Sequence, residues 1–179
     1  MLNQYFIMTN ATRSFRVEKD VSNILDEEAE RMGISVNALV NIILKHYSEF
    51  NRFLSKIDLV ILNRDILTKL LEFMDEQNLF KIGLELGETI PKDTILFWKK
   101  DLDQENVFEY LEKILCRYGL LGTYDQIDQQ GEKIIVIRHR LGKKGSIFFH
   151  GYIKSTLNIV GLDSNIEVTE SSVKAKIAI

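Results

Sequence analysis

The sequence has little of what marks exported or membrane-spanning chains. Its 179 residues include a single cysteine, Cys116, so no internal disulfide can form and a reducing cytoplasm is the expected setting. One proline and 10 glycines argue against long disordered linkers. Residues 1–8 lack the basic region and the long apolar run of a signal peptide. No apolar run approaches the roughly 20 residues that cross a bilayer, so no membrane association is expected.

The sequence also lacks an excess of basic residues. Its 23 Lys and Arg residues stand against 26 Asp and Glu residues, which gives a net charge of -3. This balance argues against a protein that coats nucleic acid by bulk electrostatics, and it leaves room only for a small basic face. Hydrophobic residues at 45% and charged residues at 27% are typical of an ordinary folded protein.

The N-terminal region opens with an alternating pattern. Phe15 and Val17 fall on one face of a short predicted strand, and Thr12, Ser14 and Arg16 fall on the other. A strand this short cannot stand alone, because a stable sheet needs further strands or a helical cover. The pattern therefore predicts that a second copy of the chain supplies a second strand.

Two amphipathic helices are predicted to follow the strand. Asp20 is a good N-cap for the first, and Gly33 suits the position just after its end. Ser35 is predicted to cap the second helix, which we expect to run to about Phe53. Its apolar stripe is wide for a lone small unit, which favours burial in a dimer.

The remainder of the chain predicts an α+β domain with an antiparallel sheet. The expected elements are a strand at 57–62, a helix capped by Asn63, a short helix at 79–86 ended by Gly87, a helical turn from Pro91, a helix at 106–118, strands at 121–127 and 133–139, a helix at 145–160, and strands at 165–169 and 172–177.

The predicted organisation has three parts. Residues 1–11 have no clear period and are expected to form a mobile arm. Residues 12–54 are expected to form a domain that binds DNA and dimerises the chain. Residues 55–179 are expected to form the α+β domain, which serves as a sensor or in oligomerisation.

The N-terminal pattern resembles the ribbon-helix-helix family, the Arc/MetJ/CopG-like DNA-binding proteins. The resemblance covers roughly a fifth of the chain. It rests on Arg13-Ser14-Phe15-Arg16-Val17, the helix capped from Asp20, the turn Met32-Gly33-Ile34-Ser35, and Asn37-Ala38-Leu39. It implies an intertwined homodimer whose two strands enter the major groove of double-stranded DNA.

The resemblance also implies which side chains read the bases. The polar strand face would carry Thr12, Ser14 and Arg16 to the base edges. Arg16 is the best equipped, because a guanidinium can donate two hydrogen bonds to guanine O6 and N7.

Phosphate contacts are implied at a second place. The N-terminus of the second helix, at Ser35, Val36 and Asn37, would hold a phosphate with its backbone N–H groups. Arg13 and Lys19 would add phosphate contacts from the strand region.

No motif of an enzyme is present. The sequence has no P-loop, nucleophile elbow or zinc-protease motif, so we expect neither catalysis nor a cofactor. Cys116, His139 and His150 lack the spacing of metal ligands, so no metal is expected, and His139 is predicted to be a hydrogen-bonded histidine of the core or its rim. Residues 138–146 either bind an anion at a helix start or form a loop with solvated lysines. The many aromatic residues either fill the core or line a ligand pocket.

The expected function is a sequence-specific, DNA-binding transcriptional regulator that acts as a homodimer or a tetramer. Its second domain would respond to a small-molecule or protein effector. Three alternatives stay open: an antitoxin of a toxin–antitoxin pair, a ligand-binding protein that its N-terminal unit only dimerises, and a dimerising strand with a solvated outer face.

Overall fold

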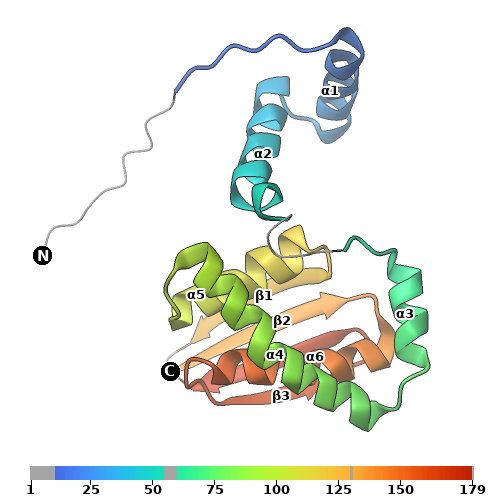
Figure 1. Cartoon of the computed structure of the whole chain (residues 1–179), viewed down its shortest axis with the longest axis vertical. Coiled ribbons are helices and arrows are strands. Elements are labelled where there is room, and N and C mark those ends of the chain that lie inside the picture. The colour runs from blue at the N-terminus through green and yellow to red at the C-terminus, as the bar shows by residue number, and fades with distance from the viewer. Residues whose placement is uncertain (1–10, 55–59, 130, 179) are drawn as a thin grey trace, which may run out of the picture. The chain divides into compact units, whose positions relative to one another are not determined.

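The computed structural model describes residues 11–54, 60–129 and 131–178. The chain divides into two compact units, Met1–Glu49 and Phe50–Ile179 (Figure 1). The arm predicted over residues 1–11 lies outside the described residues, apart from Ala11. None of the helices in the described ranges has the length and apolar character needed to cross a membrane.

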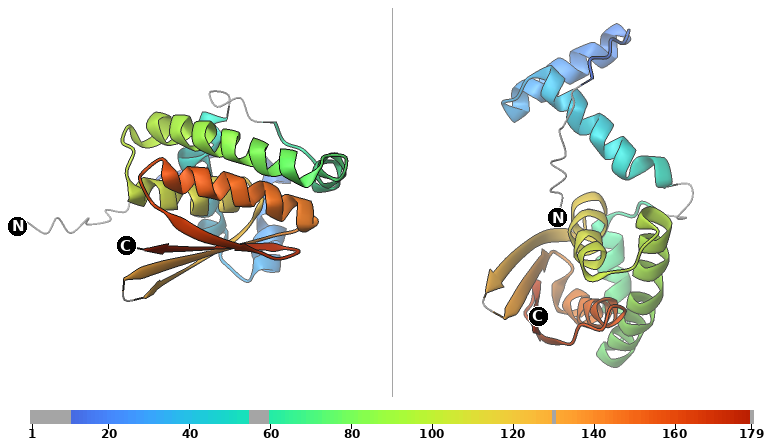
Figure 2. Two further views of the ribbon diagram at one scale, coloured as in Figure 1. Left: turned by 90° about the horizontal axis from the view of Figure 1, so that it is seen from below. Right: turned by 90° about the vertical axis from the view of Figure 1, so that its left-hand side faces the viewer.

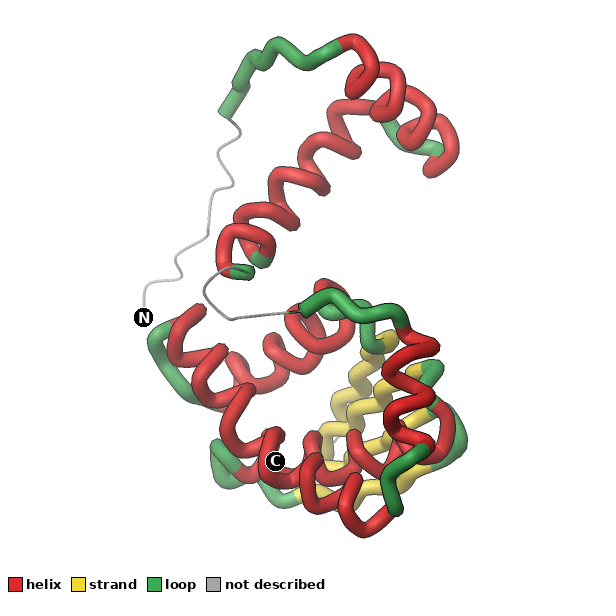
Figure 3. The backbone as a smooth tube through the Cα atoms, turned by 45° about the vertical axis from the view of Figure 1, so that its right-hand side comes forward, coloured by secondary structure: helices red, strands yellow, loops and turns green. Residues whose placement is uncertain are grey.

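The first unit is a pair of helices, α1 (Lys19–Met32) and α2 (Val36–Glu49) (Figure 3). Gly33 ends α1 as predicted, in the left-handed conformation with φ of 66° that glycine adopts without steric cost. Ser35 precedes α2, and its Oγ accepts a hydrogen bond from the Ala38 N–H at 3.2 Å. The predicted break between the two helices and the Ser35 cap are therefore confirmed.

The strand predicted over Thr12–Val17 is not formed. Residues 11–18 have no regular secondary structure, and their side chains are exposed. A strand needs a hydrogen-bonding neighbour, and no segment of the described single chain pairs with these residues. The structure therefore has the two predicted helices, but without the strand it does not support an N-terminal ribbon-helix-helix.

The ends of the two helices also differ from the prediction. The N-cap of α1 is Glu18, which makes no side-chain capping bond, and Asp20 lies in the first turn. An acidic side chain there still complements the helix dipole. The second helix ends at Glu49 instead of near Phe53, and a separate 3-10 turn, η1 (Asn51–Phe53), follows.

The second unit has α+β architecture, as predicted, with a four-stranded antiparallel sheet in the order β1-β2-β4-β3. Its other elements are α3 (Arg64–Glu72), α4 (Glu76–Lys99), α5 (Gln104–Glu109), the π-helix η2 (Tyr110–Tyr118), β1 (Gly122–Gln129), β2 (Glu132–His139), α6 (Gly142–Asn158), β3 (Ser164–Val168) and β4 (Ser172–Ala178).

The helices of this unit lie on one face of the sheet (Figure 2). Helix α6 packs on β2, β4 and β3, whereas η2 packs on β1, and α4 lies across α6. Inward-facing Ile137 of β2 lies between Tyr124 of β1 and Val173 of β4. The inward apolar positions of β2 and β4 are fully buried and form the floor of the core.

Helices α4 and α6 cross at very close range. A Cβ atom built on Gly83 would lie 2.2 Å from the Phe148 carbonyl oxygen, and one on Gly87 would lie 2.2 Å from that of Tyr152. A separate helix at 79–86 and a new turn from Pro91 were therefore wrong predictions, since α4 runs unbroken through both residues. These glycines serve close helix packing and do not end the helix.

Pro91 leaves a gap in the hydrogen bonding of α4, which Thr156 of α6 fills. Proline has no N–H to donate to the Gly87 carbonyl four residues earlier. The buried Thr156 Oγ1 lies 3.2 Å from that oxygen and 2.7 Å from the Tyr152 carbonyl oxygen of its own helix. Its single hydroxyl proton is within reach of both acceptors.

Helix α3 begins and ends at defined polar contacts. Asn63 caps it as predicted, accepting the Asp65 N–H at 2.8 Å. The Lys144 ammonium donates to the Glu72 carbonyl oxygen at 2.7 Å and also to that of Met74. The strand predicted at 57–62 lies partly outside the described residues, and residues 60–62 form no strand.

Candidate functional site

The predicted base-reading side chains lie together in the segment that precedes α1. Thr12, Ser14 and Arg16 are exposed, as is Arg13. Three basic residues and one acidic residue occupy positions 12–19. This segment is therefore locally basic within an acidic chain, as a small DNA-binding face requires.

The N-terminus of α2 has backbone donors to offer. The first four N–H groups of a helix have no partner within the helix. Here the Ser35 side chain takes the N–H of Ala38 and its carbonyl takes that of Leu39, at 3.2 and 3.0 Å. Val36 and Asn37 precede these two residues and belong, with Ser35, to the three residues that the sequence predicts to hold a phosphate.

Acidic side chains gather on α1. Five of its residues are Asp or Glu, and its one late cation, Arg31, forms an ion pair with Glu28. The hydrogen bond from Arg31 lowers the pKa of the Glu28 carboxyl. Any surface of this unit that meets DNA must therefore exclude the acidic face of α1, because like charges repel.

The first unit exposes an unusual amount of apolar surface. Ala29 and Leu39 are the only buried hydrophobic residues among those described in it. Nine large apolar side chains are at least 41% exposed, and Phe15, Ile24 and Tyr47 are the most exposed, at 63%, 58% and 58%. The full set is Phe15, Val17, Val21, Ile24, Met32, Ile42, Ile43, Leu44 and Tyr47. So many exposed apolar side chains in one small unit favour an interaction site.

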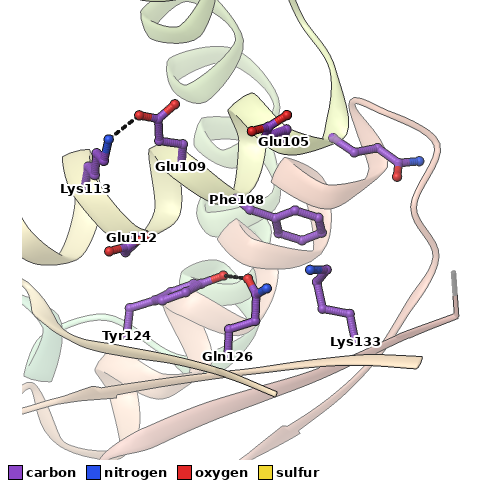
Figure 4. A pocket seen from close by; sticks show the side chains of 9 residues that line it. Glu105, Phe108, Glu109, Glu112, Lys113, Tyr124, Gln126 and Lys133 are labelled. Atoms are coloured by element: carbon purple, nitrogen blue, oxygen red, sulfur yellow. Dashed lines mark hydrogen bonds and ion pairs between the residues drawn. The ribbon is translucent and has the colours of Figure 1, made fainter. Parts of the chain in front are cut away.

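A second candidate site is a cleft of about 600 Å³ in the α+β unit. One wall is the continuous helix formed by α5 and η2, and the other is the β1–β2 hairpin (Figure 4). The lining residues are Gln104, Glu105, Phe108, Glu109, Glu112, Lys113, Tyr124, Gln126 and Lys133. None of them is among the predicted DNA-contact residues, although Phe108 belongs to the aromatic residues that the sequence offers either to the core or to a ligand pocket. One signal in the sequence could have indicated the cleft. The polar groups of Tyr124 and Gln126 on β1 occupy the positions opposite the buried Ile137 and Ile135 of β2, where apolar side chains are expected.

Glu109 is the most strongly engaged carboxylate of this cleft. It forms ion pairs with Lys99 of α4 and with Lys113 one turn further along its own helix. Burial acts to raise its pKa, but the two ammonium groups outweigh burial and the pKa is lowered. Burial and the nearby Glu112 carboxylate raise the pKa of the Tyr124 phenol, which donates to Gln126 Oε1 at 2.8 Å.

The residues considered as metal ligands do not meet. No cluster of three or more His, Cys, Asp or Glu side chains in the described part of the chain could hold a metal ion. The Cys116 thiol is buried, and burial raises its pKa to about 12, so it is not a reactive thiolate. His150 instead contacts the ring of Phe80, with centroids 4.9 Å apart.

His139 has the structural role that its position predicts. It is buried, and its Nδ1 accepts a hydrogen bond from the Leu141 N–H at 3.2 Å. The ring proton therefore lies on Nε2, 2.9 Å from the Ser146 Oγ, and burial lowers the pKa of the ring. Within the 138–146 segment, the Lys144 ammonium donates a hydrogen bond to the Glu72 carbonyl oxygen at the end of α3.

Comparison of the chain with protein-family models and with curated protein sequences finds no match in either case.

Proposed function

We propose that the chain is a sequence-specific DNA-binding regulator of transcription that acts as a homodimer. Each of the two copies contributes the two helices of its first unit to the dimer. Residues 12–17 of the two copies pair as an antiparallel ribbon. That ribbon enters the major groove, whose width accommodates two strands.

The observation that carries this proposal is the exposed apolar surface of the first unit. Burying a large apolar side chain fully stabilises by about 1.5–3 kcal/mol. Nine half-exposed side chains would therefore contribute roughly 10 kcal/mol per copy if a partner covered them. The two copies together would contribute roughly 20 kcal/mol. This stabilisation is larger than the estimated cost of association, which is about 4–15 kcal/mol.

Dimerisation also accounts for the absence of the strand in the single chain. Phe15 and Val17 alternate with polar residues and are exposed at 63% and 56%. A two-stranded ribbon would place both on the helices of the dimer and leave Ser14 and Arg16 facing outward. The compact second unit favours a regulator over an antitoxin, whose toxin-binding segment is expected to be a flexible tail.

The DNA-binding part is tested with two arginine variants of equal charge. Genomic fragments retained by the purified protein give a candidate operator, and fluorescence anisotropy at stated salt concentrations gives its affinity. Arg16→Ala should weaken binding about tenfold to a hundredfold, the effect of losing one bidentate base contact. Arg31→Ala removes the same charge from α1 and should leave the affinity unchanged. Equal affinity for the Arg16 variant and the native protein would sink the groove-reading claim.

The dimer is tested separately by sedimentation equilibrium. Ile43→Glu places a charge in the exposed apolar surface and should shift the protein toward monomer, because burying that carboxylate would be costly. Asn41→Glu adds the same charge on the polar side of the same helix and should leave a dimer. A native protein that stays monomeric at high concentration would refute the dimer outright.

A further inference from the structure

The inner face of the sheet is apolar on β2 and becomes polar on the edge strand β1. Ile135 and Ile137 of β2 are almost completely buried. Their partners on β1 are Gln126 and Tyr124, so polar side chains occupy positions that would otherwise extend the core. The two polar side chains bond each other, with the Tyr124 hydroxyl 2.8 Å from Gln126 Oε1, and Gln126 is exposed. This end of the sheet is therefore polar and open instead of continuing the core.

The helix opposite this strand is polar on the same side. Glu105, Phe108 and Glu112 recur at intervals of three and four residues, which places them on one helix face. They line the cleft together with Tyr124 and Lys133 of the hairpin. Figure 4 shows Glu105 on the helix wall and Lys133 on the strand wall, with the Phe108 ring between them. The cleft thus has a carboxylate on one wall, an ammonium on the other and an aromatic surface in the middle.

Most charges of the helix wall are neutralised within the protein. Glu109 is held by Lys99 and Lys113, and Glu112 pairs with Arg117 at 2.7 Å. Glu105 differs, because it has no ion-pair partner among the described residues. It is therefore the carboxylate on this wall that a ligand can engage without breaking an existing pair.

The strand wall offers one cation in a defined position. The Lys133 side chain is only 15% exposed, and its ammonium lies 2.7 Å from an Asp128 oxygen and 4.7 Å from the centre of the Phe108 ring. Every charged side chain that lines the cleft, apart from Glu105, has an ion-pair partner, and with these partners included the acidic and basic residues are equal in number. A ligand with a large net charge of either sign would upset this balance.

We propose that the cleft binds a free α-amino acid with an aromatic or large apolar side chain. Its ammonium group pairs with Glu105, its carboxylate accepts from Lys133, whose ammonium it shares with Asp128, and its side chain packs on Phe108 and Tyr124. A zwitterion is the ligand class that satisfies walls of opposite charge without adding net charge. The volume of about 600 Å³ lies within the range of small-molecule pockets.

The assignment is tested by isothermal titration calorimetry on the full-length chain without DNA, so its outcome does not depend on the proposed DNA-binding function. Three probes separate the charge requirements: L-phenylalanine has both charged groups, phenethylamine lacks the carboxylate, and 3-phenylpropanoate lacks the ammonium. Phenylalanine should bind at least about tenfold more tightly than either analogue, because each analogue loses a charge-assisted hydrogen bond. Equal binding of the three probes, or no binding of phenylalanine, would overturn the assignment.

Matched variants place the binding in this cleft. Glu105→Gln and Lys133→Met should each weaken phenylalanine binding about tenfold. Glu170→Gln, in the turn between β3 and β4, and Lys154→Met, on the exposed side of α6, make the same changes elsewhere and should have no effect. Circular dichroism confirms that each variant is folded. Controls that weaken binding as much as the cleft variants would show that phenylalanine binds elsewhere.

Discussion

The contact between Thr156 and the Gly87 carbonyl leads to a quantitative prediction about how α4 tolerates its proline. Thr156→Val keeps the shape of the side chain and removes the hydroxyl, which leaves the buried Gly87 oxygen without the donor that lies 3.2 Å away. A buried acceptor without a partner costs about 1–3 kcal/mol. The free energy of unfolding of the second unit should therefore fall by about 1–2 kcal/mol.

Pro91 makes this prediction specific, because it is the reason that the Gly87 carbonyl needs an outside donor. In a Pro91→Ala background, the N–H of residue 91 can bond that carbonyl within α4. Thr156→Val should then cost less, and the difference between the two backgrounds should be at least about 0.5 kcal/mol, as found for residues that share one hydrogen-bonding group.

Urea denaturation followed by the fluorescence of Trp98, the only tryptophan, reports on the second unit alone. Thr89→Val is the matched control: its hydroxyl bonds the Glu85 carbonyl at 3.2 Å on the exposed side of α4, and its loss should cost less than about 0.5 kcal/mol. An equal cost of Thr156→Val in both backgrounds would refute the reasoning, because the hydroxyl proton would then serve only Tyr152.

Three further predictions concern the second unit. Gly87→Ala usually favours a helix by about 1 kcal/mol, but a Cβ 2.2 Å from the Tyr152 oxygen should instead lower the urea stability by about 2–3 kcal/mol. Burial lowers the pKa of His139, so the unfolded chain takes up its proton first. The free energy of unfolding should then fall by up to about 1.4 kcal/mol per pH unit below about pH 6.5, and His139→Gln should flatten that slope in urea titrations. Lys144→Met removes the donor at the end of α3 and should speed amide hydrogen exchange in that helix before the rest of the unit.

Local signals in the sequence were sufficient for much of the fold. Gly33 and Ser35 define the break between α1 and α2 because one residue adopts a left-handed conformation and the other supplies a cap. Asn63 marks the start of α3 for the same kind of reason. Alternating patterns on either side of Gly131, whose φ is 79°, located the β1–β2 hairpin. Each of these features depends on a few neighbouring residues.

The errors arose where distant segments decide the structure. Gly87 and Pro91 look like the end of one helix and the start of another, yet α6 packs so closely that α4 needs a residue without a Cβ at that crossing. Thr12–Val17 has the pattern of a strand, but a strand forms only beside a partner. Pattern alone cannot indicate whether a partner is present in the same chain.

The candidate sites divide in the same way. The predicted DNA-contact residues from Thr12 to Asn37 form a short stretch of sequence and could be named from it, and their role stays a prediction. The cleft joins residues of α5 and η2 to residues of β1 and β2, on opposite sides of the turn at Gly119. Only the packing of η2 on β1 brings these walls together, so spacing in the sequence could not show the cleft.

The position of β4 affects how the second unit can be assembled during synthesis. It leaves the ribosome after α6 and β3, yet it lies inside the sheet, with β2 on one side and β3 on the other. Until it emerges, the β1–β2 hairpin and β3 have no hydrogen bonds to each other, and the inner face of β2 lacks its neighbour. The nascent unit therefore cannot complete its sheet cotranslationally in steps from one edge, and it must close around its last strand.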